Sequence, residues 1–494
     1  MADLVEAHGP FLDGRFVAAE GATFAVDDPA TEQVVTEVRG ASVAQVEQAI
    51  MAARRAFDEG PWPTLAVGER VAAMHRFAAA LEARRDILIE TVIAETGCPR
   101  TVTERAQIDM ALESARQLPD IYASLPEWEH NELPMSEYLA GGKVRLSLRR
   151  YEPVGVVAAI SPYNFPFVTN VWKVVPALVT GCTVILRPSP LTPLEALVLG
   201  EAAAEAGLPP GVFNVVVESG AAGGELLSSH RAVDLVSFTG STTVGRAIAA
   251  QAAPTMKRLI LELGGKSVQL HLPDVLEDSP ESAARSAMSV FASHAGQGCS
   301  LQTRVLVPMQ HKAAVLDVLA GAVPAIKVGD PRQRTTVVGP VISAAHRDRI
   351  SKLVNEGVSA GGRIVAGGTT VDMPPTGWFY PPTVLDIDDN ANPVAQREVF
   401  GPVVTVQGYH DLDQAVVIAN DTEYGLSNGI YTDDLVTGER LAGRLRSGTV
   451  QVNQGAASAY TTMGGYKQSG IGRERGVPGL RAFQEIKHVV IGNR

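Results

Sequence analysis

The pattern of apolar positions divides the chain into a helical first part and a second part in which short strands alternate with helices. Ser42 and Gln45 have the spacing of a capping box, which predicts a helix that runs towards Phe57. The next predicted helix carries one apolar stripe, made by Val71, Met74, Phe77, Ala78 and Leu81. We expect this stripe to lie in a core.

Residues 143–152 alternate between apolar and polar side chains, as Val144, Leu146 and Leu148 show. This is typical of an exposed strand or hairpin whose edge needs a partner. From residue 154 onward, strands are predicted at 154–160, 183–186, 212–217 and 235–238, and helices near 167–179, 193–206 and 243–251. Such alternation predicts an α/β fold with a parallel sheet and helices on both faces.

Composition narrows the class of protein. A chain of 494 residues exceeds one ordinary core, so we expect more than one domain. Hydrophobic residues at 46% and charged residues at 19% are typical of a soluble globular protein, and a net charge of -12 argues against nucleic acid or an anionic membrane as partner. The start lacks a secretion signal, no apolar run is long enough to cross a membrane, and three cysteines do not suggest a disulfide framework. We therefore expect a cytoplasmic protein.

Polar loops follow the predicted strands, at the edge where parallel α/β sheets bind ligands. They contain Ser161, Pro162, Arg187, Ser189, Gly240 and Ser241. Each loop alone is also consistent with an ordinary turn, and Ser241 with an ordinary helix N-cap, but the three together favour a nucleotide site. The fingerprint of three spaced glycines is absent from the first strand-to-helix turn, so a standard Rossmann site is not predicted.

Two residues are candidates for catalysis. Cys299 ends the sequence GQGC at 296–299, where glycines allow backbone amides and a substrate to approach the sulfur. The segment is consistent with a nucleophile and equally with a buried structural cysteine. Glu262 lies between apolar residues beside a glycine pair, where desolvation would raise its pKa and make it a base. The alternative is a structural glutamate paired with Lys266 or with a backbone amide.

Six motifs resemble, in order, those of the NAD(P)-dependent aldehyde dehydrogenase superfamily, and they cover nearly the whole chain. The motifs are PYNFP at 162–166, FTGST at 238–242, LELGGK at 261–266, GQGC at 296–299, EVFGP at 398–402 and GGYKQSG at 464–470. The resemblance implies several structural regions. These are a dinucleotide-binding domain at 1–130 and 153–262, a catalytic domain at 263–440, oligomerisation strands at 131–152 and 482–494, and a return segment at 441–481 that completes the site.

The resemblance also implies a reaction and four catalytic residues, Cys299, Glu262, Asn164 and Lys173. The Cys299 thiolate would attack the aldehyde carbon, and the thiohemiacetal would pass a hydride to the nicotinamide. The Asn164 amide and the Cys299 backbone amide would hold the oxyanion. Glu262 would activate the water that hydrolyses the thioester to a carboxylic acid, and Lys173 would lie near these groups.

A cofactor site and an aldehyde pocket follow from the same resemblance. The cofactor residues are Ser161, Pro162, Arg187, Ser189, Gly240, Ser241, Leu263, Glu398 and Phe400. Ser241 would lie at the pyrophosphate and Glu398 at the nicotinamide ribose. The pocket residues are Phe165, Trp172, His294, Ser300, Tyr460 and Met463. This apolar and aromatic set indicates an aliphatic or aromatic aldehyde of modest size, without a basic clamp for a carboxylate.

Several positions depart from the family pattern. Arg187 stands where many members have lysine, and Pro190 where many NAD-preferring members have a glutamate for the adenine ribose. A missing carboxylate removes a repulsion against a 2′-phosphate, which an arginine could pair with. We favour NAD because no second basic residue accompanies Arg187 in this loop, and NADP is the alternative. Tyr163, His294, Gly298 and Arg397 also differ from more frequent residues without removing a catalytic group.

The predicted strands at 131–152 and 482–494 resemble those that join family members, so we expect a homodimer or homotetramer. Two other functions stay open: a coenzyme A-acylating dehydrogenase, and a non-catalytic binding or structural protein on the same fold. Glu262, as a base for water, weighs against the first, and the intact set of catalytic residues weighs against the second. A cysteine hydrolase would leave the nucleotide half unexplained. No metal site is predicted.

Overall fold

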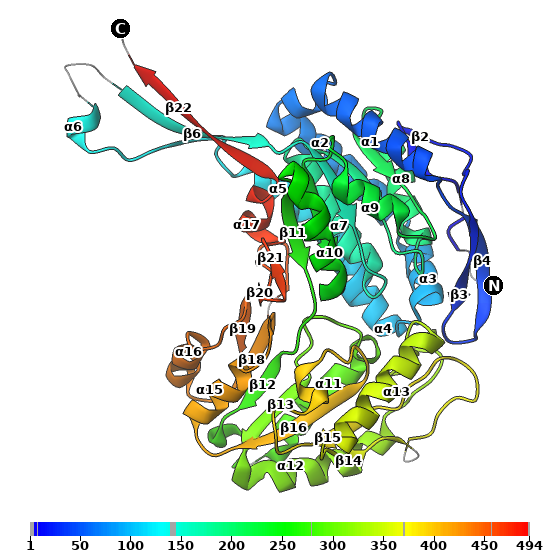
Figure 1. Cartoon of the computed structure of the whole chain (residues 1–494), viewed down its shortest axis with the longest axis vertical. Helices are drawn as coiled ribbons and strands as arrows, with labels where there is room; N and C mark the ends of the chain where they lie inside the picture. The colour runs from blue at the N-terminus through cyan, green and yellow to red at the C-terminus, as the bar shows by residue number, and fades with distance from the viewer. Residues whose placement is uncertain are drawn as a thin grey trace.

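The computed structural model describes residues 4–6, 8–138, 145–277, 279–368, 371–455 and 457–492. The described elements form two units, each built on a largely parallel sheet, and an arm that projects from the first unit (Figure 1). The first unit is drawn mainly in blue to green and the second in green through yellow to orange, while the arm joins cyan and red strands.

The first sheet has the order β2-β1-β9-β8-β7-β10-β11-β21. Its strands are β1 (Phe11–Leu12), β2 (Arg15–Phe16), β7 (Val156–Ile160), β8 (Thr183–Arg187), β9 (Phe213–Val215), β10 (Leu235–Thr239), β11 (Arg258–Glu262) and β21 (Gly470–Ile471). Strands β9, β8, β7 and β10 pair in parallel, as predicted, and β11, which was not predicted, continues the parallel order. The antiparallel strands β1 and β21, which flank the parallel strands, come from distant parts of the chain, so local alternation did not predict them.

Helices cover both faces of this sheet. Val157 and Ala159 of β7 pack into one apolar cluster, whereas Val156 and Ala158 pack into another, because alternate residues of a strand point to opposite faces. The helices of this unit are α1 (Val43–Asp58), α2 (Val67–Glu82), α3 (Arg85–Thr96), α4 (Arg100–Val102), α5 (Met110–Ala123), α7 (Pro166–Val179), α8 (Leu194–Glu205), α9 (Ala222–Ser229) and α10 (Thr242–Ala252). The capping box that starts α1 is confirmed, since Ser42 and Gln45 bond each other's backbone amides with their side chains.

The second sheet has the order β14-β15-β16-β13-β12-β18-β19 and is parallel except for the edge strand β14. Its strands are β12 (Val268–His271), β13 (Arg304–Pro308), β14 (Arg363–Ala366), β15 (Thr383–Asp386), β16 (Val403–Tyr409), β18 (Ser427–Tyr431) and β19 (Thr449–Val452). The helices of this unit are α11 (Pro280–Ala292), α12 (Met309–Ala322), α13 (Ala344–Ser359), α14 (Pro393–Gln396), α15 (Leu412–Asn420) and α16 (Leu435–Ala442). Apolar clusters again fill both faces, because Val305 and Leu306 belong to different clusters.

The arm is an antiparallel sheet of the order β22-β6-β5. Its elements are β5 (Trp128–His130), α6 (Met135–Tyr138), β6 (Arg145–Pro153) and β22 (Gln484–Gly492). Lys143 and Val144 of the predicted alternating segment, and residues 493–494 of the predicted tail strand, lie outside the described residues. The remaining elements are β3 (Thr23–Asp28), β4 (Gln33–Arg39), β17 (Tyr424–Gly425), β20 (Tyr466–Lys467) and α17 (Gly476–Arg481).

Across the parts of the chain that the structure describes, we find no helix with the length and apolar character needed to cross a membrane.

Gly155, directly before β7, offers a test of how tightly the first sheet is built. It has a φ of +131°, and an added Cβ would lie 1.8 Å from the Asp234 carboxylate, which accepts a hydrogen bond from the Val156 amide. We expect Gly155→Ala to lower the free energy of unfolding by about 2 kcal/mol or more, measured by chemical denaturation. Gly207→Ala is the control, because Gly207 also has a positive φ of +71° but open space around it. Equal losses in the two variants would contradict the steric argument.

Candidate active site

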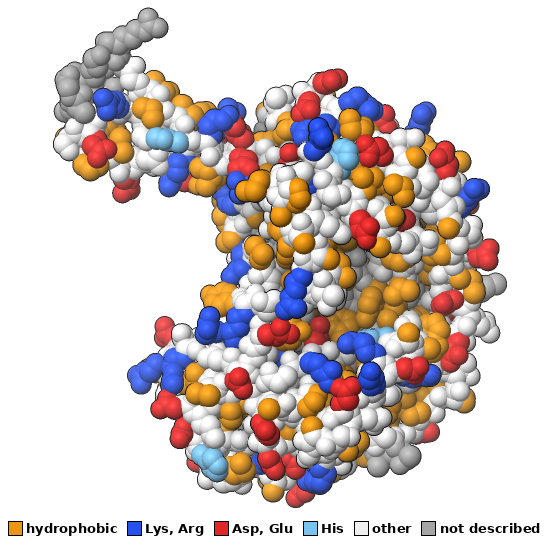
Figure 2. Space-filling model, viewed as in Figure 1, with side chains coloured by type: hydrophobic (Ala, Val, Ile, Leu, Met, Phe, Trp, Pro, Cys, Tyr) orange, Lys and Arg blue, Asp and Glu red, His pale blue; other side chains and the backbone are white. Residues whose placement is uncertain are grey.

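Two sheet edges meet where the first unit joins the second. Strands β8, β7, β10 and β11 lie side by side and end at, or directly before, Arg187, Ser161, Thr239 and Glu262. Residues 263–267 then lead directly into β12 of the second sheet. The carboxyl edge of the first sheet is therefore continuous with the amino edge of the second. Figure 2 shows that the surface is hollowed between the upper and lower parts and that hydrophobic side chains gather there.

Cys299 lies at this junction. It precedes β13, which pairs in parallel with β12, so both strands begin at the same edge. The Asn164 side-chain amide, at the start of the loop-to-α7 segment, donates to the Gln297 carbonyl oxygen at 2.8 Å. A Cβ on Gly265 would lie 2.4 Å from the Cys299 carbonyl oxygen, so only glycine fits there. The structure thus brings together the predicted nucleophile and the predicted oxyanion amide.

Cys299 is half-buried, and the charges of three glutamates act on its thiol. Burial, followed by the charges of Glu398 and Glu262, raises the pKa of the thiol to about 12. Cys98 and Cys182 are fully buried, and burial also raises the pKa of both thiols. Cys299 is therefore the accessible thiol of the three, and it rests in the protonated form.

Glu262 is buried at the end of β11, and neither of its carboxylate oxygens has a hydrogen-bond partner among the described residues. Burial and then the neighbouring Glu474 raise its pKa well above the usual value, while Lys173 lowers it. The alternative of a structural pair with Lys266 is not seen, because the buried Lys266 ammonium also lacks a partner in the described part of the chain. An unpaired buried carboxylate is unusual and points to function.

Lys173 is fully buried on α7, and its ammonium lies 2.5 Å from the Glu474 carboxylate and donates to the Ser237 hydroxyl at 3.2 Å. Glu474 comes from the return segment, and the sequence interpretation missed it. The neighbouring Arg475 was also missed: its guanidinium carbon lies 4.6 Å from the centre of the Trp172 ring. The glycine-rich motif that precedes both residues marked the region, but it did not identify which charged side chains turn inward.

The predicted cofactor residues line the carboxyl edge of the first sheet. The buried hydroxyls of Ser161 and Thr239 have no hydrogen-bond partner within the described ranges, so both are available to a polar ligand. Ser241 caps α10 and accepts from the Val244 amide at 3.3 Å, and this helix start offers amides to a phosphate. Gly240 donates to the Glu262 carbonyl at 3.0 Å, and Leu263 donates to the Ser469 carbonyl at 2.9 Å.

Arg187 and Ser189 lie at the far end of this edge. The Arg187 Nε lies 2.6 Å from a Glu218 oxygen, and the Ser189 hydroxyl accepts from the Leu191 amide at 3.2 Å. The sequence interpretation did not identify Glu218. These residues, together with the unpartnered hydroxyls, supply the charged and polar groups that a dinucleotide requires.

Glu398 and Phe400 lie beside the cysteine loop. Glu398 accepts a hydrogen bond from the Gly265 amide at 3.0 Å, and burial raises its pKa to about 7. The Phe400 ring meets the Tyr163 ring edge-on, with centroids 6.0 Å apart, next to the half-buried Pro162. The predicted nicotinamide end of the site therefore adjoins Cys299.

The six predicted pocket residues differ in burial. The Phe165 ring meets the fully buried His294 ring edge-on at 5.7 Å, and burial lowers the pKa of His294 to about 3, so it is neutral. Trp172 donates from its indole to the Ser114 hydroxyl at 3.1 Å, and Met463 exchanges two backbone hydrogen bonds with Glu474. The two exposed residues are Ser300 and Tyr460.

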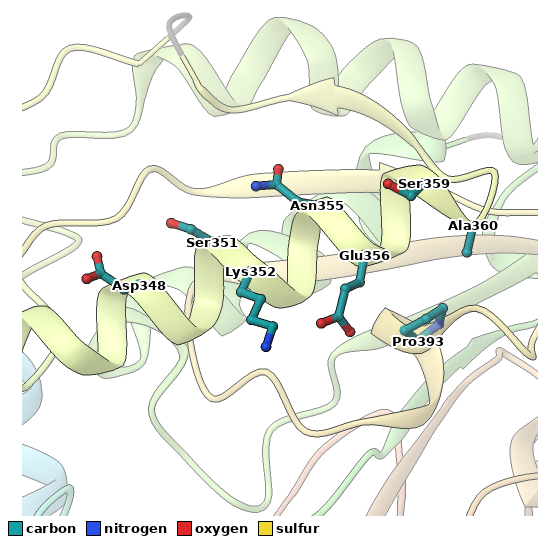
Figure 3. Close-up of a pocket in the computed structure, with 8 residues that line it drawn as sticks. All are labelled: Asp348, Ser351, Lys352, Asn355, Glu356, Ser359, Ala360 and Pro393. Atoms are coloured by element: carbon teal, nitrogen blue, oxygen red, sulfur yellow. The ribbon is translucent and has the colours of Figure 1, made fainter.

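A separate surface pocket of about 850 Å³ lies along α13, away from these residues (Figure 3). It is lined by Asp348, Ser351, Lys352, Asn355, Glu356, Ser359, Ala360 and Pro393. None of the predicted catalytic groups lines it, and Glu356 is already paired with Arg397. We assign the chemistry to the junction of the sheets instead.

Comparison with known proteins identifies the class. Residues 16–489 match the model of the aldehyde dehydrogenase family. Geranial dehydrogenase of Castellaniella defragrans is 38% identical, and the match covers 97% of this chain and 98% of that protein. A putative aldehyde dehydrogenase of Bacillus subtilis, DhaS, is 36% identical, and the match covers 97% of this chain and 94% of that protein. A mutant of aldehyde dehydrogenase C of Pseudomonas syringae, solved with NAD+ and octanal, has a TM-score of 0.91 and 34% identity over 99% of this chain and 98% of its own.

The chain therefore belongs to the aldehyde dehydrogenase family, and the resemblance and the α/β fold predicted from the sequence are confirmed. It is accordingly an NAD(P)-dependent enzyme that acts on an aldehyde group.

The raised pKa of Cys299 can be tested by alkylation of the protein without cofactor. Because the thiol pKa is about 12, the rate of reaction with iodoacetamide should rise about tenfold per pH unit from about pH 7 to about pH 10, without levelling off. Mass spectrometry of the modified peptide provides the measurement. Cys299→Ser is the control and should leave little labelling, since the other two cysteines are fully buried. A plateau below about pH 9 would show that the thiolate is stabilised instead.

Proposed function

We propose that the protein oxidises an aldehyde to a carboxylic acid through a covalent adduct on Cys299. The proposal depends most on one observation: the half-buried Cys299, the Asn164 amide and the buried Glu262 carboxylate, which has no hydrogen-bond partner among the described residues, share one sheet junction. The Cys299 thiol loses its proton to water, and the thiolate attacks the aldehyde carbon to form a thiohemiacetal whose oxygen carries the negative charge. The Asn164 amide and the Cys299 backbone amide stabilise the oxyanion in this largely buried setting.

NAD(P)+, when bound, supplies the hydride acceptor. Ser161, Pro162, Ser189, Gly240, Ser241 and Leu263 would hold the dinucleotide along the carboxyl edge, Arg187 would lie at its adenosine end, and Glu398 and Phe400 would lie at the nicotinamide end. The buried hydroxyls of Ser161 and Thr239, which lack a hydrogen-bond partner in the described part of the chain, support this assignment. We divide the chain accordingly into a cofactor-binding domain at 1–130 and 153–262, a catalytic domain at 263–440, and a return segment at 441–481.

Glu262 completes the reaction by removing a proton from the water that hydrolyses the thioester. Its raised pKa makes it a stronger base than an exposed carboxylate, and its oxygens have no competing partner in the described residues. Lys173 positions the neighbouring Glu474, and their mutual neutralisation leaves Glu262 as the carboxylate that can accept the proton.

The reaction is tested with purified protein, a panel of aldehydes and NAD+ or NADP+, with and without coenzyme A, by following formation of the reduced cofactor. Turnover without coenzyme A, with release of the free acid, supports the proposal. Turnover only with coenzyme A would contradict hydrolysis and show that the acyl group is transferred to coenzyme A. Absence of turnover with every aldehyde would favour a non-catalytic protein.

The role of Glu262 has a sharper test. We expect Glu262→Gln to keep a burst of reduced cofactor equal to about one per active site, because the thioester still forms. Steady-state release of acid should fall by about 100-fold, since the general base is lost. Stopped-flow absorbance measures both phases. Glu225→Gln, on exposed α9, is the matched control and should behave as the wild type. An unchanged steady-state rate in Glu262→Gln would remove Glu262 from the mechanism.

For the substrate, we propose an aliphatic or aromatic aldehyde of modest size. Phe165, Trp172 and Met463 supply apolar surface, and His294 is neutral. The octanal in the Pseudomonas syringae structure and the name of geranial dehydrogenase, both from similar proteins, support an apolar chain. Arg475 was not foreseen; its guanidinium carbon lies 4.6 Å from the centre of the Trp172 ring, and two of its buried nitrogens have no hydrogen-bond partner among the described residues.

We also propose a homodimer or homotetramer in the cytoplasm, joined through the arm. The outer strand β22 exposes Ile486 and Val490, which are 64% and 57% accessible, and its outer edge is open to pairing. The three free cysteines support a reducing compartment.

Assembly through β22 predicts a measurable change in mass. We expect the double substitution Ile486→Lys and Val490→Lys to shift the protein to a smaller species in size-exclusion chromatography with light scattering, because charge would replace the apolar contact. Val417→Lys, at a 66% exposed position on α15, is the control and should keep the wild-type mass. A monomeric wild type, or an unchanged mass in the double variant, would contradict assembly through this strand.

A further inference from the structure

An ion pair joins the ends of β8 and β9, at the adenosine end of the proposed cofactor site. Arg187 is the last residue of β8, and Glu218 follows β9, its neighbour in the sheet. The Arg187 Nε lies 2.6 Å from Glu218 Oε1, and the side chains are only 11% and 6% exposed. A second guanidinium nitrogen of Arg187 donates to the Gly220 carbonyl at 2.5 Å. The arginine is thus held on two sides.

Glu218 is fixed just as firmly. Its Oε2 accepts a hydrogen bond from the Gly223 amide at 2.8 Å, and its Oε1 accepts one from the Gly224 amide at 2.9 Å. Both amides belong to the first turn of α9. The Glu218 carboxylate is thus held by one arginine and two backbone amides. Its negative charge therefore stays next to Arg187.

This arrangement bears on the choice between NAD and NADP. In dinucleotide sites of this kind, a carboxylate near the ribose favours the 2′-hydroxyl, and a free arginine favours a 2′-phosphate. The sequence has no carboxylate at Pro190, and it has one arginine in the loop. With Arg187 alone, the loop would be open to NADP. With Glu218 beside it, the arginine is already neutralised.

We propose that Glu218 is the residue that sets a preference for NAD over NADP, by engaging Arg187 and placing a carboxylate at the adenosine end from the adjacent strand. To bind, a 2′-phosphate would have to displace Glu218 from Arg187 or lie close to a second anion, and either would weaken the binding of NADP+. A 2′-hydroxyl is uncharged, so NAD+ binds without these penalties. This inference rests on the proposed cofactor site, but it concerns binding and does not depend on the chemistry at Cys299.

The simpler interpretation is that Glu218 only caps α9. In that case, its removal would destabilise the fold, but it would change the affinities for the two cofactors equally. A change in their ratio therefore separates the two roles.

Cofactor binding to the full chain, measured by isothermal titration calorimetry without aldehyde, tests the proposal. The wild type should bind NAD+ at least about tenfold more tightly than NADP+. In Glu218→Ala, the dissociation constant for NADP+ should fall by about tenfold or more, while that for NAD+ changes by less than about threefold. Adding Arg187→Gln to this variant should abolish the gain, because the freed arginine is what receives the 2′-phosphate.

Glu225→Ala is the matched control, since it removes one negative charge from the exposed side of α9 without releasing Arg187. Its ratio of affinities should equal that of the wild type. A folded Glu218→Ala with the wild-type ratio would overturn the proposal. If that variant does not fold, the affinities of the wild type for the two cofactors provide the test. Equal or tighter binding of NADP+ overturns the proposal, and tighter binding of NAD+ supports it. Aldehyde turnover with either cofactor would leave the proposed reaction intact in every case.

Discussion

The short connection from Glu262 to Val268 is the constraint on which the rest of the site depends. It takes the chain from the carboxyl end of β11 directly into β12, so the two sheets must meet edge to edge. Parallel pairing of β12 with β13 then places Cys299 at the same edge. Gly265 lies so close to the Cys299 carbonyl that no larger residue fits. The base is therefore held at the end of a strand, and the nucleophile lies in the loop before β13, packed against Gly265.

This junction concentrates negative charge in a buried place. Burial raises the pKa of the Cys299 thiol most, and the charges of Glu398, Glu262 and Glu474 raise it further. Lys173 neutralises Glu474, whereas Glu262 keeps two unpartnered oxygens among the described residues. The site therefore favours the protonated forms of the Cys299 thiol and the Glu262 carboxyl group. A positive charge brought into it would favour their ionised forms. The other end of the cofactor edge shows the opposite arrangement, because Arg187 and Glu218 neutralise each other.

Prediction from the sequence succeeded where the signal is local. The helix from Ser42, the strands that became β7, β8, β9 and β10, and the polar residues at their ends were all foreseen to within about two residues. The helix and strand periodicities and the cap residues depend on neighbours in the chain, so they can be interpreted without a structure. Strand partners that are distant in the sequence were missed. Strand β21, from the return segment, pairs with Leu261 and Glu262 of the first sheet, and no local periodicity predicts that pairing.

The sequence by itself determined the alternation of strands and helices, the family motifs, and a glycine-flanked thiol with a carboxylate and an amide available to it. Only the tertiary structure decided which charges face one another. Lys173 meets Glu474 across 301 positions of the chain, and Arg187 meets Glu218 across a strand boundary. The physical reason is that a charge acts over a few ångströms of space, whereas separation along the chain says little about that distance until the sheets have formed.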